Sequence, residues 1–132
     1  MKRWGVLTAA AIVAASGLVT VRAQGAHPYS GHADYQVYCS SCHGAEARGD
    51  GAIAPSLKPR PADLTQLTRR NDGVFPSERV FKLIDGRSGG HEAADMPKWG
   101  EVFAKATESA GAEQTAARID TLVKYLETLQ AK

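Results

Sequence analysis

Two cysteines and a histidine stand together in the run Cys39-Ser40-Ser41-Cys42-His43, and the sequence has no other cysteine. The spacing C-x-x-C-H is typical of the covalent attachment of c-type haem. Two thiols separated by two residues can add to the two vinyl groups on one edge of a porphyrin. The imidazole of the following histidine can then bind the iron. The run therefore predicts one covalently bound haem c, with His43 as an axial ligand.

Three other interpretations of the two cysteines are weaker. Two residues between the cysteines suit a redox-active disulfide better than a structural one. A thioredoxin-like redox site would be surrounded by a βαβ pattern, which the sequence lacks. A zinc site would need a second Cys or His pair at ligand spacing, and none follows.

The first residues have the pattern of a secretory signal peptide. Met1-Lys2-Arg3 is basic, residues 4–21 carry no charge, and small residues follow. We expect cleavage after Ala23, or otherwise after Ala26. The alternative is an uncleaved membrane anchor, although the stretch is shorter and less apolar than most spanning helices. The predicted organisation is a signal peptide at 1–23, a flexible lead at 24–30 and one domain at 31–132, with export to the periplasm.

Removal of residues 1–23 changes the charge of the chain. The full sequence has a formal charge of +2, and loss of three basic residues leaves 13 Lys and Arg against 14 Asp and Glu. No basic run exceeds Arg69-Arg70, and no aromatic residues alternate with basic ones. A nucleic-acid partner is therefore not expected.

Electron transfer needs a second axial ligand, and the best candidate is Met96. It would be the only methionine left after signal cleavage, and it precedes Pro97 in a loop where its side chain is free of helical constraint. A thioether favours ferrous iron and raises the reduction potential. His91 is the rival ligand, and His27 and His32 are further candidates.

Other residues are predicted to support the cofactor. His43 should donate its second N–H to a backbone carbonyl, which fixes the ring and its tautomer. Pro55 suits this role because it offers a carbonyl and no competing donor. Four side chains could donate hydrogen bonds to the haem propionates: Arg60, Lys58, Arg48 and Trp99.

The periodicity of apolar residues predicts an all-α fold. Helices are expected over 32–42 with Gly44 as its end, 62–70, the segment from an N-capping Ser77 to Gly86, and 101–107. The last helix carries an amphipathic stripe after a lead-in at 114–117: Ile119, Leu122, Val123, Leu126 and Leu129. The sequence has no strand signals and no repeats.

These residues resemble the class I monohaem cytochromes c of bacteria from about residue 31 to 129. The N-terminal helix is similar in Gly31-x-x-x-Tyr35 followed by the cysteine run, and Pro55 matches the proline whose carbonyl meets the haem histidine. The other similar segments are Ile84-Asp85-Gly86, Met96-Pro97-x-Trp99-Gly100 and Leu122 to Leu126. Two features depart from the pattern: His91 lies in the loop at 89–95, and the segment 103–113 is long.

The resemblance implies a small cytochrome c fold whose N- and C-terminal helices cross and whose helices and loops enclose the haem. It also implies a periplasmic one-electron carrier, not an enzyme, with His43 and Met96 on the iron. Redox protein partners would dock transiently at the haem edge. We expect a monomer that meets membranes only through a partner complex or an uncleaved leader. Two alternatives stay open: a haem subunit of a membrane-associated dehydrogenase or oxidase complex, and a haem enzyme or sensor with a labile sixth ligand.

Overall fold

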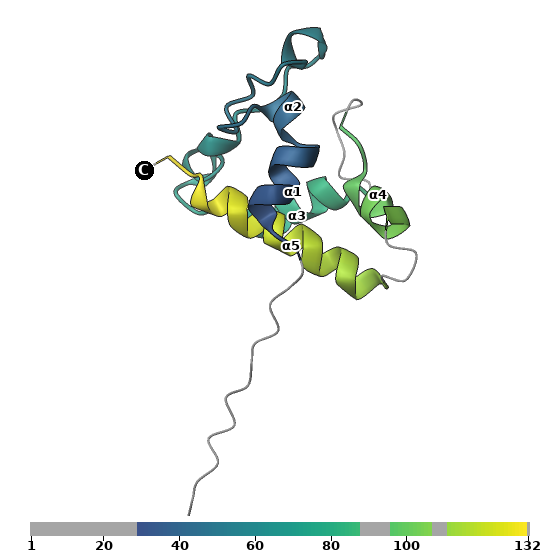
Figure 1. The fold of residues 1–132 in the computed structure, drawn as a ribbon. Helices are drawn as coiled ribbons and strands as arrows, with labels where there is room; N and C mark the ends of the chain where they lie inside the picture. The colour runs from purple at the N-terminus through teal and green to yellow at the C-terminus, as the bar shows by residue number, and fades with distance from the viewer. Residues whose placement is uncertain (1–28, 88–95, 107–110, 132) are drawn as a thin grey trace, which may run out of the picture.

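The computed structural model describes residues 29–87, 96–106 and 111–131, and the regular secondary structure of these residues is entirely helical (Figure 1). The prediction of an all-α fold is thus confirmed. The predicted signal peptide, His27 and His91 lie outside the described residues. None of the described helices has the length and apolar character needed to cross a membrane. The α-helices are α1 (Gly31–Tyr38), α2 (Ser40–His43), α3 (Ser77–Asp85), α4 (Trp99–Ala106) and α5 (Ala112–Thr128).

The first predicted helix is present as two pieces that meet at Cys39. The side chain of Ser30 caps α1 by accepting a hydrogen bond from the N–H of Ala33 at 3.3 Å. The carbonyl of Cys39 accepts the N–H of His43 at 2.9 Å, so the chain continues directly into α2. Gly44, with φ of 84°, ends α2 as predicted, because this backbone conformation is strained for residues with a Cβ.

The first and last helices cross with their backbones almost in contact, and Figure 1 shows α1 lying across α5. A Cβ on Gly31 would collide with the carbonyl oxygen of Thr121 and would lie 2.9 Å from the Cβ of Tyr125. The rings of Tyr35 and Tyr125 meet with centroids 5.5 Å apart. The predicted crossing of the N- and C-terminal helices is therefore confirmed, and it lies at Gly31 and Tyr35.

The helix predicted over 62–70 is wrong. The chain forms short 3-10 helices at Leu64–Gln66 and Arg69–Asn71 instead. The side-chain amide of Gln130, just beyond α5, explains the difference. Its nitrogen donates to the carbonyl of Leu64 at 2.8 Å, and its oxygen accepts the N–H of Thr68 at 2.9 Å. In an α-helix that carbonyl and that N–H would bond to each other, so Gln130 replaces an α-helical turn.

Helices α3 and α4 begin differently from the prediction. Ser77 is the first residue of α3 rather than its N-cap. The N-cap is Pro76, and Pro76 makes no side-chain capping bond. Helix α4 begins at Trp99, two residues before the predicted start, because the carbonyl of Lys98 accepts the N–H groups of Glu101 and Val102. The predicted end of α3 at Gly86 is confirmed.

The core lies where α5 packs against α1, α3 and α4. Its buried apolar residues come from all four helices and from the loop after α2. They are Tyr35, Ala47, Val80, Ile84, Phe103, Ile119, Leu122, Val123 and Leu126. The α5 residues among them belong to the amphipathic stripe that the sequence predicted.

Candidate cofactor site

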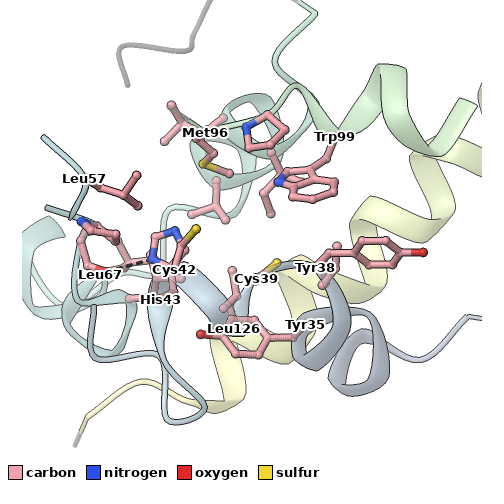
Figure 2. Close-up of a pocket in the computed structure, with 18 of the residues that line it drawn as sticks. Tyr35, Tyr38, Cys39, Cys42, His43, Leu57, Leu67, Met96, Trp99 and Leu126 are labelled. Atoms are coloured by element: carbon pink, nitrogen blue, oxygen red, sulfur yellow. Dashed lines mark hydrogen bonds between the residues drawn. The ribbon is translucent and has the colours of Figure 1, made fainter. Parts of the chain in front are cut away.

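A largely apolar cavity of about 520 Å³ opens beside this core (Figure 2). Its volume falls in the range of about 300–1,000 Å³ that is usual for ligand and cofactor sites. Its walls come from α1 and α2, the segment 57–67, helix α3, the segment 96–99 and α5. The apolar wall includes Leu57, Leu64, Leu67, Val80, Leu83, Ile84, Leu122 and Leu126.

Cys39, Cys42 and His43 lie together on one side of this cavity. The two thiols are not joined in a disulfide. Burial raises the pKa of the Cys39 thiol to about 12, and the negative charge of nearby Asp34 adds to the effect. The described residues contain no group of three or more His, Cys, Asp or Glu that could hold a metal ion. The cysteine pair therefore belongs to an apolar pocket rather than to a described cluster of metal ligands.

The imidazole of His43 is oriented by a backbone carbonyl, as predicted, but the carbonyl belongs to Ala62. Nδ1 lies 3.1 Å from the oxygen of Ala62. Since a carbonyl only accepts, Nδ1 carries the proton and Nε2 keeps a lone pair for a metal. Burial lowers the pKa of His43, although the bond to Ala62 opposes this, and the ring is favoured in its neutral, ligating form.

The prediction that Pro55 provides this carbonyl is wrong. Pro55 is exposed in a 3-10 helix at Ala54–Ser56 and does not line the cavity. That segment is tied to the outside of the cysteine turn, where the N–H of Gly51 donates to the carbonyl of Cys42 at 3.1 Å. The carbonyl that meets the imidazole comes from Ala62, in the segment 59–62 that lines the cavity, so Ala62 takes the role expected of Pro55.

Met96 faces the cavity from the side opposite His43 (Figure 2). Pro97 and Trp99 line the cavity beside it. His32 does not reach this cavity. It is exposed on α1, and its ring meets that of Tyr125 with centroids 5.3 Å apart. Among the described candidates for a second iron ligand, Met96 alone lines the cavity.

Of the four residues predicted to bind propionates, the structure places two at the cavity. Arg60 and Trp99 line it, whereas Arg48 and Lys58 are exposed and do not. The Trp99 ring also meets Tyr38, another lining residue, at a centroid distance of 5.4 Å.

Two contributions to the site were missed in the sequence. Ala62 has a side chain that gives no signal, because its role depends only on its carbonyl. Tyr35 was noted only as part of a similar segment, yet its buried hydroxyl donates to the carbonyl of Gly44 at 2.7 Å. A buried tyrosine usually finds such a partner, which would have been a reason to look for one next to the cysteine run.

The donor set fits one covalently attached haem. Two thiols and a neutral imidazole share one side of an apolar cavity, and a thioether faces them from the other. A family model described as "Cytochrome C oxidase, cbb3-type, subunit III" matches residues 26–126. No curated protein and no solved structure matched the chain. The family match confirms both the resemblance to class I monohaem cytochromes c and the expected haem c.

Proposed function

The chain belongs to the cytochrome c family of cbb3-type oxidase subunit III, and we propose that it is an exported one-electron carrier whose haem iron is bound by His43 and Met96. The observation that carries this proposal is the placement of these two side chains on opposite sides of one apolar cavity. Two permanent protein ligands leave no position on the iron for a substrate, which favours electron transfer over catalysis.

The haem would supply a one-electron couple between ferric and ferrous iron. The protein's part is to hold and tune it. Cys39 and Cys42 would attach the haem covalently, and Ala62 fixes the orientation of the His43 ring. The thioether of Met96 would stabilise the ferrous state, and the apolar wall would limit the access of water to the iron. Arg60, exposed at the edge of the cavity, is suited to hydrogen-bond a propionate.

The visible spectrum of the matured protein, oxidised and reduced, tests the ligation. We expect low-spin spectra, a ferric sulfur–iron charge-transfer band and no response of the reduced protein to carbon monoxide. A high-spin spectrum that shifts with carbon monoxide would show an open iron, and a haem enzyme or sensor would then replace the carrier.

A second candidate is a haem subunit of a membrane-associated oxidase complex, which the description of the matching family favours. This candidate uses the same site, but its electron transfer takes place inside a stable assembly. The native mass of the protein purified from its own membranes and from its soluble fraction separates the two candidates. A carrier is recovered alone and soluble, whereas a subunit copurifies with membrane-spanning chains in detergent.

A further inference from the structure

The end of α3 and the beginning of α4 are locked together just outside the cavity. Gly86, in the left-handed conformation with φ of 65°, is so close to Lys98 that a Cβ there would lie 2.9 Å from Cγ of the lysine. Gly100 is buried, and a Cβ on it would collide with the carboxylate of Asp85 and lie 2.8 Å from Nε of Arg87. Three consecutive residues, 85–87, thus meet the segment 98–100.

Asp85 is buried, with 6% of its surface exposed, and its negative charge lies at an unfavourable place in the helix. It is the last residue of α3, and the C-terminal end of a helix repels negative charge. The positive charge of Arg87 balances this carboxylate. Its Nε donates to Oδ1 of Asp85 at 2.8 Å, and a second guanidinium nitrogen lies 2.7 Å from the same oxygen. The carboxylate also lies against the first turn of α4, whose N-terminal N–H groups attract negative charge.

We propose that Asp85 and Arg87 are positioning residues that hold Met96 toward the haem iron. Met96 lies two residues before Lys98, and Trp99, next to Gly100, lines the same cavity. The side chains of both partners lie against the backbone of Gly100, so the pair fixes the position of the segment that carries Met96 and Trp99. This inference rests on the proposed ligation of the iron by Met96.

The test uses the haem-loaded protein with Asp85→Asn and, separately, Arg87→Gln. The matched control is Glu78→Gln, which removes the exposed ion pair of Glu78 with Lys82 on the same helix. Two midpoints are measured in increasing urea: loss of the ferric sulfur–iron band, and loss of helical circular dichroism. The rate at which carbon monoxide binds the reduced protein reports how often the methionine leaves the iron.

We expect both test variants to lose the sulfur–iron band at clearly lower urea than the wild type, with a smaller change in the helical midpoint. Carbon monoxide binding should become about tenfold faster, because Met96 would leave the iron more often. The factor is moderate because Arg87 is partly exposed, and such a pair stabilises less than a fully buried one. Glu78→Gln should change neither. If Asp85→Asn does not fold, Arg87→Gln decides the matter, because its side chain is partly exposed.

The inference is overturned if the wild type has the sulfur–iron band and the variants keep it with unchanged carbon monoxide kinetics. It is also overturned if the band and the helical signal are lost at equally lowered urea concentrations, since the pair would then stabilise the fold as a whole. A wild type without any sulfur–iron band would instead refute the proposed ligation by Met96, and this inference with it.

Discussion

At the residue scale, His43 is held from two directions. Its own ring bonds to Ala62, and the hydroxyl of Tyr35 donates to the carbonyl of the next residue, Gly44. Tyr35→Phe keeps the ring but removes this donor from a buried place. We expect the free energy of unfolding in urea to fall by about 1–2 kcal/mol. Tyr125→Phe is the control, because its ring contact with Tyr35 remains; an equal loss in both variants would contradict a special role for the Tyr35 hydroxyl.

The same hydroxyl should make stability depend on alkaline pH. Burial, followed by the nearby Cys39, raises the pKa of Tyr35 above its ordinary value. The unfolded chain then releases the proton at lower pH than the folded protein does. The contribution is fully present below about pH 10 and is lost as the pH rises above it. Urea unfolding at pH 9 to 11 should show a steeper fall for the wild type than for Tyr35→Phe, and parallel curves would refute the prediction.

The identity of the second iron ligand is also decided by single residues. Met96→Ala removes the only described candidate at the cavity, so the sulfur–iron band should vanish, reduced iron should bind carbon monoxide and the reduction potential should fall. His91→Ala is the matched variant and should leave all three unchanged. The opposite result, with Met96→Ala silent and His91→Ala open to carbon monoxide, would assign the ligand to His91.

At the scale of elements, α1 and α5 are joined by an ion pair in addition to their close backbones. Two guanidinium nitrogens of Arg118 donate to the two oxygens of the buried Asp34 at 2.8 and 2.6 Å. The guanidinium also lies over the ring of Phe103, 4.1 Å from its centroid. The hydrogen bond to Asp34 is the main reason why the pKa of Arg118 is raised, so the arginine stays charged.

Asp34→Asn should therefore leave a largely buried arginine side chain without its counter-charge. We expect the free energy of unfolding to drop by about 3 kcal/mol, measured in urea. Asp120→Asn is the control on α5, because its pair with Lys124 is exposed and contributes little. Equal losses in the two variants would show that burial of the Asp34 pair does not increase its contribution to the free energy of unfolding.

The helices that the sequence predicted well are those whose apolar faces pack directly on the core, such as α3 and α5. Periodicity captures this because the same residues that set the pattern make the contacts. The helix over 62–70 failed because Gln130, more than sixty residues away, takes its hydrogen bonds. The ion pair of Asp34 with Arg118 was missed for the same reason, since a pairing over 84 residues leaves no local pattern.

At the scale of the whole molecule, the site has two kinds of residue. Some are identified by the chemistry of their side chains, and others take part only because the path of the folded chain brings them there. Cys39, Cys42, His43 and Met96 could be proposed from the sequence because a haem site of this kind needs thiols, an imidazole and a thioether, and the structure has all four residues at the cavity. The carbonyl that orients His43 can come from any residue, and the prediction chose Pro55 where the folded chain presents Ala62. Asp85 was noticed only as part of a similar segment, and its contact with Gly100 emerges only when α3 meets α4.

The cofactor and the core share their walls, so the fold should depend on the haem. Val80, Ile84, Leu122 and Leu126 belong to the core and line the cavity as well. Without haem, these walls would lose the surface against which they pack, and the stability of a small domain is low enough for such a loss to matter.

The chain with Cys39→Ala and Cys42→Ala, made without haem, tests this dependence. We expect reduced helical circular dichroism and a broad thermal transition, because the walls of the cavity lose the surface that they pack against. Cys42→Ala alone, loaded with haem through the remaining thiol, is the matched control and should unfold cooperatively. A sharp transition of the double variant at the unfolding temperature of the loaded protein would contradict this prediction. It would show that α1, α3 and α5 form a stable core without the haem.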